Sequence, residues 1–176
     1  MRLFGCVVPW SCEIAGFPGI GKMEGALVLG ERVRVISMPM RYARGMPGPC
    51  MFTAEKGAVI EIGDDSYVAG TVFCAGKRIS IGKRVLIAGG CKIFDSDGHV
   101  VDAVPHSLYV RDEPEETRIE DDVWLGCDVM ICKGVTIGKG SVIGAKSMVI
   151  RDIPPGVLAA GIPAEVIRPL RLGDKA

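Results

Sequence analysis

A six-residue repeat fills residues 119–154 and limits what this chain can fold into. The segment divides into six units, IEDDVW, LGCDVM, ICKGVT, IGKGSV, IGAKSM and VIRDIP, and every unit begins with an aliphatic residue. A period of six fits neither the helical period of about 3.6 nor the two-residue alternation of an isolated strand. The repeat therefore predicts short strands joined by tight corners, in which each unit buries an aliphatic side chain against the unit stacked on it.

Two other positions of the unit support this interpretation. The fifth residue is small or β-branched in every unit, so we expect it to face inward beside the first. Glycine recurs at the second position, as Gly126, Gly138 and Gly144. Because glycine has no Cβ, it tolerates close backbone approach and a positive φ at a corner.

The repeat also sets the expected domain boundaries. Earlier units begin at Ile62, Val68, Cys74, Ile81, Ile87 and Ile93, with one extra residue near Ser80 shifting the frame. We predict an N-terminal arm over residues 1–28, a parallel β-helix over residues 29–154, and a C-terminal cap and tail over residues 155–176. The repeat is lost over residues 39–53, which predicts a loop or irregular coil. A second interruption, residues 99–118, predicts a protruding loop, and loops of this length are usually functional.

Three segments carry a resemblance to a known family. IEDDVWLG, GVTIGKGSVIGAKSMVIRDIPPG and AAGIPAEVIR resemble the closing pattern of the left-handed parallel β-helix acyltransferases, over roughly residues 55–169. The resemblance implies an all-β, left-handed parallel β-helix shaped as a triangular prism. The handedness rests on the resemblance alone, since parallel crossovers are generally right-handed.

Charge and cysteine content exclude several classes of protein. Lys and Arg number 21 and so do Asp and Glu, so no whole-protein field attracts nucleic acid. Seven cysteines without CxxC spacing favour a reduced, cytoplasmic protein, with Cys74 and Cys91 facing inward. No apolar run approaches the length of a membrane span, which is about 18 residues or more, and a membrane contact of residues 1–28 is the weaker alternative to an arm packed on the first coil.

His99 is the leading catalytic candidate. Histidine is the side chain that titrates nearest neutrality, which suits a general base that removes a proton from a hydroxyl. IFDSDGHVVD is similar to the family segment in which the catalytic histidine stands where a loop leaves the helix. His106 lies in the same loop without a motif, and we expect it at the rim. Asp97 is the candidate that orients the imidazole, although Asp95, Asp97 and Asp102 are equally compatible with polar corner residues.

The resemblance also implies a coenzyme A site between adjacent prisms of a homotrimer. Trp124 occupies the sixth position of its unit, which points outward, and the matching tryptophan of the family lines the acyl-donor channel. The residues carried over for the donor are the Cys127 amide near the thioester, Ala145 along the pantetheine, and Ile150, Arg151 and Arg168 towards the nucleotide. Glu165 departs from the family pattern, because this position is commonly basic. An ordinary solvated surface is the alternative reading of Arg151 and Arg168.

These residues lead to a functional hypothesis. We expect an acetyl-CoA-dependent O-acetyltransferase that acts on a sugar or polysaccharide precursor, with His99 as the base and no metal. An antibiotic O-acetyltransferase and a catalytically silent β-helix scaffold are the alternatives. A γ-type carbonic anhydrase shares the prism but needs three histidine ligands, and this chain has two histidines.

Overall fold

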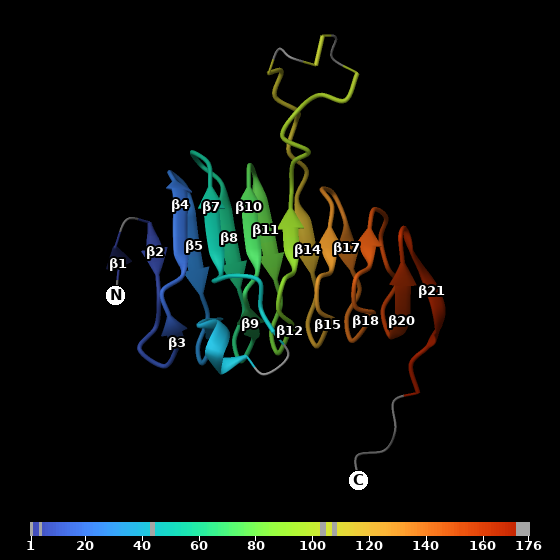
Figure 1. Ribbon diagram of the computed structural model, residues 1–176, viewed down its shortest axis with the longest axis horizontal. Helices are drawn as coiled ribbons and strands as arrows, with labels where there is room; N and C mark the ends of the chain where they lie inside the picture. Colours follow the sequence, from blue (N-terminus) through green and yellow to red (C-terminus); the bar gives the residue numbers. More distant parts are fainter. Residues whose placement is uncertain (1, 4, 43–44, 103–104, 107–108, 172–176) are drawn as a thin grey trace.

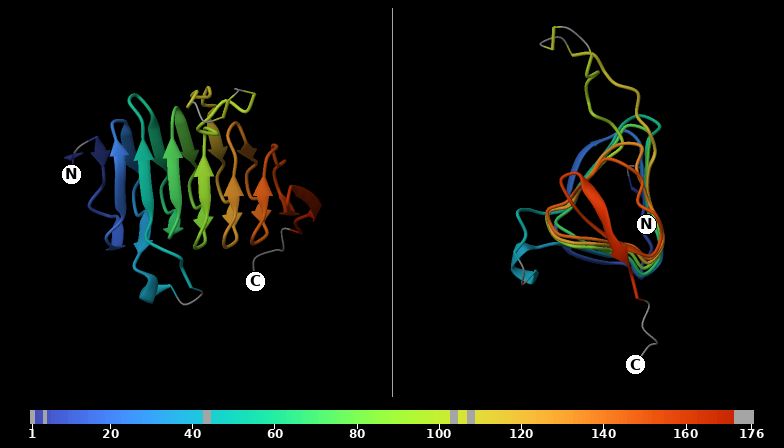
Figure 2. Two further views of the ribbon diagram at one scale, coloured as in Figure 1. Left: turned by 45° about the horizontal axis from the view of Figure 1, so that its top comes forward. Right: turned by 90° about the vertical axis from the view of Figure 1, so that its right-hand side faces the viewer.

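Short strands stacked in parallel build a three-sided prism (Figure 1). The structure, a computed structural model, describes residues 2–3, 5–42, 45–102, 105–106 and 109–171. Viewed end-on, the coils superimpose as a triangle (Figure 2). In the described residues the helical structure is one 3₁₀ turn, η1 (Pro39–Arg41). The predicted all-β, left-handed parallel β-helix is confirmed.

Each side of the prism is one sheet, which we call sheet A, B or C. Sheet A contains β1 (Arg2–Leu3), β2 (Cys6–Val7), β5 (Ala26–Leu29), β8 (Val59–Ile62), β11 (Arg78–Ile81), β14 (Thr117–Ile119) and β17 (Thr136–Ile137). Sheet B contains β3 (Glu13–Gly16), β6 (Arg34–Ser37), β9 (Tyr67–Ala69), β12 (Leu86–Ile87), β15 (Trp124–Leu125), β18 (Val142–Ile143), β20 (Val157–Gly161) and β21 (Ala164–Pro169). Sheet C contains β4 (Gly19–Met23), β7 (Met51–Ala54), β10 (Val72–Ala75), β13 (Lys92–Phe94), β16 (Met130–Ile131) and β19 (Met148–Val149). The three edges of the prism are named A–B, B–C and C–A after the sheets that meet there.

The first residue of each repeat forms the core. Ile119 pairs in register with Ile137, and Ile137 pairs in turn with Ile153 in the next coil. Ile119 and Ile137 are at most 1% exposed, whereas the Lys139 side chain is 62% exposed. The predicted register of residues 119–154 is therefore confirmed. Burial of one aliphatic side chain per side per coil gives the prism a continuous apolar axis.

Close backbone approach and a positive φ, both expected at the second-position glycine, occur at different positions of the corner. A Cβ on Gly126 would lie 2.6 Å from the Ala145 nitrogen of the next coil, and one on Gly138 would lie 2.4 Å from the Pro155 nitrogen, so close approach at the second position is confirmed. The positive φ instead occurs at the fourth position, for example at Asp122 (φ 62°) and Lys146 (φ 60°). The second-position glycines are needed for packing between coils rather than for a left-handed turn.

Opposite charges stack along the A–B edge. The corner residues with positive φ in four successive coils are Arg32, Asp65, Arg84 and Asp122. The Arg32 guanidinium pairs with Asp65 at 2.6 Å, and the Arg84 guanidinium pairs with Asp122 at 2.6 Å. These pairs are largely exposed to solvent, so they fix the corner side chains and contribute little to stability.

One detail of the early repeats differs from the prediction. Cys74 is exposed, because Phe73 pairs with Ile93 and occupies the inward position. The corner before β10 is one residue shorter than a regular corner, and the corner between β10 and β11 is two residues longer, which together give the one extra residue predicted near Ser80. Cys91 is buried as predicted, and burial raises the pKa of its thiol to about 12.

The N-terminal boundary lies earlier than predicted. Residues 1–28 were expected to form an arm, but strands β2, β3 and β4 pair in parallel with β5, β6 and β7 of the following coil. β1 then pairs antiparallel with β2 at the end of the sheet. This segment shows no hexapeptide period, yet β2, β3 and β4 form a coil, because backbone pairing to the next coil does not require aliphatic first positions.

Two loops and a hairpin complete the fold. Residues 38–50 leave the B–C edge, where a loop or irregular coil was expected over 39–53, and residues 95–116 leave the C–A edge, close to the predicted 99–118 (Figure 2). β20 and β21 form the antiparallel C-terminal cap. The tail after Arg171 lies outside the described residues. No helical segment in the described part of the chain has the length and hydrophobicity needed to cross a membrane.

Candidate functional site

The loop of residues 95–116 begins at a buried carboxylate. Asp95 is fully buried, and its side chain accepts hydrogen bonds from the N–H groups of Gly76 (2.6 Å), Lys77 (2.7 Å) and Arg78 (2.6 Å). The Glu115 N–H on the returning arm donates to the Asp95 carbonyl at 2.8 Å. Asp95 thus holds the base of the loop on the preceding coil, and it is occupied by this task.

His99 stands where the loop projects from the C–A edge. Its Nδ1 lies 2.8 Å from the Val100 carbonyl oxygen. A carbonyl can only accept, so Nδ1 carries the proton and the neutral ring has its basic lone pair on Nε2. The rings of Tyr109 and His106 each pack edge-on against His99 with centroids 6.0 Å away. The half-buried imidazole is therefore held beside two aromatic rings in the Nδ1–H tautomer.

Asp97, the carboxylate expected to orient His99, has another partner. Asp97 pairs with the Lys133 ammonium at 3.0 Å, and Asp102 is exposed. The Val100 carbonyl accepts the ring N–H that Asp97 was expected to accept. An orienting role for Asp97 therefore stays a prediction. Asp112, which sequence analysis passed over, is buried on the returning arm beside Asp97.

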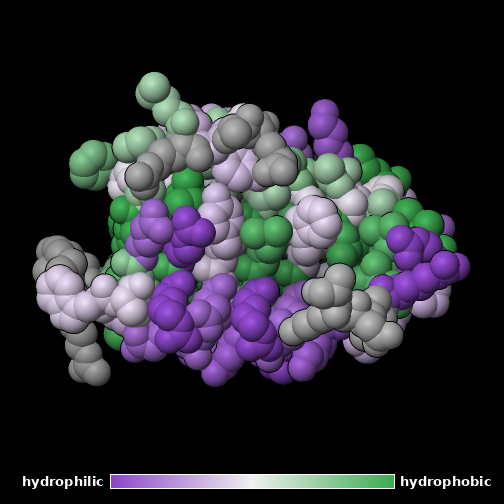
Figure 3. Space-filling model, turned by 90° about the horizontal axis from the view of Figure 1, so that it is seen from below, coloured by the Kyte–Doolittle hydropathy of each residue, from purple (hydrophilic) through white to green (hydrophobic). Residues whose placement is uncertain are grey.

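An apolar pocket of about 610 Å³ lies on sheet B, and it brings together three of the predicted donor residues, Trp124, Cys127 and Ala145. Trp124 is 49% exposed between Leu86 and Val142 of the neighbouring strands, which confirms that it points outward. From below, this side of the prism shows hydrophobic surface bordered by a band of hydrophilic side chains (Figure 3). Such a surface suits the apolar arm of a thioester ligand.

Tyr42 closes one side of this pocket and was missed by sequence analysis. It comes from the loop of residues 38–50, and its hydroxyl accepts a hydrogen bond from the Gly89 N–H at 3.0 Å. The hydroxyl also lies 3.8 Å from the Cys127 sulfur. Burial raises the pKa of Tyr42, which keeps the phenol neutral. A loop without repeat pattern gave no signal that it folds back over sheet B.

The remaining predicted donor residues lie on two different sides. Ile150, 46% exposed, and Arg151, exposed, follow β19 at the C–A edge, the edge that also carries His99. Arg168 lies on β21 in sheet B and donates to the Pro169 carbonyl at 3.0 Å, and Glu165 is on the same strand. Within one chain, the predicted residues thus lie in the sheet B pocket (Trp124, Cys127 and Ala145), on β21 of sheet B (Arg168) and at the C–A edge (Ile150 and Arg151).

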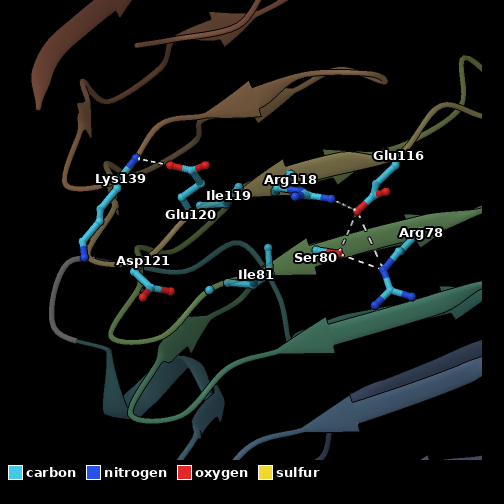
Figure 4. Close-up of a pocket in the computed structure, with 10 residues that line it drawn as sticks. Arg78, Ser80, Ile81, Glu116, Arg118, Ile119, Glu120, Asp121 and Lys139 are labelled. Carbon is cyan, nitrogen blue, oxygen red and sulfur yellow. Dashed lines mark hydrogen bonds and ion pairs between the residues drawn. The ribbon is translucent and has the colours of Figure 1, made fainter. Parts of the chain in front are cut away.

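A second cavity, of about 560 Å³, lies on sheet A (Figure 4). It is lined by charged side chains that neutralise one another: Arg118 pairs with Glu116 at 2.9 Å, and Arg78 approaches the same carboxylate at 3.7 Å. The Lys139 ammonium lies 4.0 Å from Asp122, and the Lys139 backbone N–H donates to Glu120 at 2.8 Å. Because the cations are already paired, this cavity is a poor candidate for binding a phosphorylated donor.

A metal centre has no support in the described residues. No group of three or more His, Cys, Asp or Glu side chains among them is placed to hold an ion. The candidate site therefore consists of one imidazole, main-chain groups and an apolar pocket.

Comparisons with known proteins identify relatives. A model described as bacterial transferase hexapeptide (six repeats) matches residues 116–151. A solved structure of a hexapeptide-repeat acetyltransferase from Vibrio cholerae O1 biovar eltor, complexed with acetyl coenzyme A, is 33% identical with a TM-score of 0.65, and the match covers 81% of this chain and 70% of that one. Galactoside O-acetyltransferase of Escherichia coli K12 is 44% identical over 99 residues, 55% of this chain and 47% of that protein.

A relative from Saccharomyces cerevisiae is 42% identical over 124 residues, 70% of this chain. The chain spans 62% of the length of that relative. It therefore spans about half to three fifths of the curated relatives named here.

Proposed function

The chain belongs to the bacterial transferase hexapeptide family, and from this premise we propose that it is an acetyltransferase that moves the acetyl group of acetyl-CoA to a hydroxyl of a sugar or polysaccharide precursor. His99 is the general base. Its Nε2 accepts the proton of the acceptor hydroxyl as the hydroxyl oxygen attacks the thioester carbonyl. The observation that supports the proposal is the bond of Nδ1 to the Val100 carbonyl, because a donating Nδ1 puts the basic lone pair of the neutral ring on Nε2.

Main-chain donors supply the second part of the mechanism. The Gly126 N–H already donates to the Ile143 carbonyl at 2.8 Å, so it belongs to the coil-to-coil ladder. We therefore assign the Cys127 N–H to the oxyanion that develops on the thioester carbonyl. Collapse of the tetrahedral intermediate expels the coenzyme A thiolate and leaves the acetyl group on the acceptor oxygen.

The acceptor and donor halves meet between copies of the chain. His99 projects from the C–A edge, whereas Trp124, Cys127 and Ala145 line the pocket on sheet B. A homotrimer would bring the C–A edge of one copy to the sheet B pocket of the next. It would also cover exposed apolar side chains of the loop, such as Val101 (72% exposed) and Tyr109 (71% exposed).

Ligand binding tests the donor half of the proposal. Acetyl-CoA should raise the melting temperature, because a ligand that binds the native state stabilises it by mass action. Trp124→Ala should weaken this effect, whereas Lys22→Ala, at a site far from the pocket in the first coil, should not. An unchanged melting temperature at millimolar acetyl-CoA would favour the silent scaffold.

An acceptor screen tests the chemistry. Sugars and amino sugars are offered with acetyl-CoA while release of free thiol is recorded, and the product is analysed for an ester or an amide. Release that depends on a sugar hydroxyl supports the proposal. Release that occurs with amines alone would assign N-acetylation instead, and release with hydroxylated antibiotics alone would favour the antibiotic-modifying alternative.

A further inference from the structure

Asp112 joins the two arms of the loop at its base. The carboxylate is 6% exposed and accepts hydrogen bonds from the Ser96 hydroxyl (2.5 Å), the Asp97 N–H (2.8 Å) and the Gly98 N–H (3.2 Å). The Lys133 ammonium donates to it at 3.0 Å. We call these five residues the Asp112 cluster.

Asp112 and Lys133 stay charged at physiological pH. Burial raises the pKa of Asp112, but the hydrogen bonds from Ser96, the Asp97 amide and Lys133 outweigh it and hold the pKa at about 2. Hydrogen bonds to Asp97 and Asp112 raise the pKa of Lys133 above its usual range. The ion pair of Asp112 and Lys133 therefore acts as a fixed bridge across the physiological pH range.

Lys133 attaches this bridge to the prism. It lies at the C–A corner directly after β16, one coil beyond the coil from which the loop departs. Its ammonium contacts carboxylates on both arms, Asp97 on the outgoing arm and Asp112 on the returning arm, each at 3.0 Å. The outgoing arm, the returning arm and the next coil thus share one polar junction.

His99 follows this junction immediately in the chain. The Gly98 N–H is shared between the Ser96 hydroxyl (2.9 Å), which itself donates to Asp112, and the Asp112 carboxylate (3.2 Å). Gly98 has a φ of 77°, which turns the chain into His99. On the other side of His99, the Val100 N–H donates to the Val110 carbonyl at 2.8 Å, which joins the arms a second time. The backbone of His99 is therefore fixed between two cross-links, and the first of them depends on Asp112.

We infer that Asp112, supported by Lys133, is a positioning residue that sets the location and tautomer of the His99 imidazole. The inference rests on the proposed function, since it gives His99 the role of base. Asp112 contacts the backbone that carries His99 and acts through it, without touching either substrate. An enzyme base must be aligned within a fraction of an ångström of the reacting proton, so loosening its backbone lowers turnover.

The activity test replaces the carboxylate by an amide. Asp112→Asn should lower kcat roughly 10-fold to 100-fold, the scale of an ångström-sized misplacement, while KM for acetyl-CoA stays near the wild-type value. Glu113→Gln removes an exposed charge one residue later and should leave both constants unchanged. Lys133→Met removes the positive charge and should lower kcat. Lys133→Arg keeps the charge and should retain most of the wild-type activity. Wild-type kcat in Asp112→Asn would overturn the inference.

A second measurement observes the His99 ring nitrogens by NMR and does not depend on turnover. The chain has two histidines, so ring nitrogen NMR signals can be assigned with His106→Gln. In the wild type the His99 signals should report the Nδ1–H tautomer, and in Asp112→Asn they should shift towards a mixture, with faster amide exchange at Gly98. Unchanged ring signals and unchanged exchange would overturn the inference. If the wild type transfers no acetyl group while Asp112→Asn still shifts these signals, the positioning stands and the proposed function has failed.

Discussion

Ile137→Ala offers the sharpest test of the repeat register. Ile137 is fully buried, with Ile119 of the preceding coil and Ile153 of the following coil as its partners. The substitution removes three carbon atoms, and at about 0.8 kcal/mol each the lost transfer free energy is about 2.4 kcal/mol. The cavity left between two coils that are fixed by backbone pairing adds to this, so the free energy of unfolding should fall by roughly 2 to 5 kcal/mol.

Equilibrium denaturation at one protein concentration measures the effect, since assembly makes stability depend on concentration. For a chain of this size the loss corresponds to a melting temperature roughly 4 to 20 °C lower. Lys139→Ala is the matched control, because it truncates an exposed side chain two residues later and should change the free energy of unfolding by less than about 0.5 kcal/mol. Equal losses in the two variants would refute the assigned register.

Three further predictions follow from the site and the corners. His99→Ala should lower turnover roughly 10²-fold to 10⁴-fold without weakening acetyl-CoA binding, while His106→Ala has a modest effect; steady-state kinetics would contradict the assignment if the two results were exchanged. Gly126→Ala should cost roughly 1 to 3 kcal/mol on denaturation, because its Cβ would press on the next coil, whereas Gly48→Ala, with open space around it, should be nearly neutral. Because the pKa of Asp112 is about 2, below its usual value of about 3.9, its carboxylate stabilises the fold above about pH 4 and this contribution is lost as the pH falls through 2; acid titration followed by amide exchange should show less acid sensitivity in Asp112→Asn.

The exposed cysteine shows where sequence patterns fail in a β-helix. Cys74 fits the period counted from Val68, and a thiol is apolar enough to be placed inside. The backbone decides otherwise, because β10 pairs Phe73 with Ile93 and leaves Cys74 opposite Phe94 on the outer face. The short corner before β10 changes which residues of this one strand face inward, and the longer corner after β10 restores the frame by Ile81. A single sequence gives no direct signal of corner length.

The loop residues show a second limit. His99 could be found because histidine is chemically distinctive and the segment around it has a recognisable motif. Asp112 and Tyr42 could not, because an aspartate and a tyrosine in loops without a repeat are compatible with solvent exposure. Their roles depend on Lys133 and Gly89, which lie 21 and 47 residues away in the chain.

The sequence by itself determined the stacked coils, the register of residues 119–154 and the edge from which His99 projects. Each of these follows from the local period or from where it is interrupted. Every inward residue packs on its equivalent in the adjacent coil, so an aliphatic residue recurs at the same position of each unit. The tertiary structure alone decided that β2, β3 and β4 form a coil, that Asp112 bridges the arms of the loop, and that Tyr42 closes the sheet B pocket. These contacts join segments that share no period, and their partners are selected by which corners and strands become neighbours once the prism has formed.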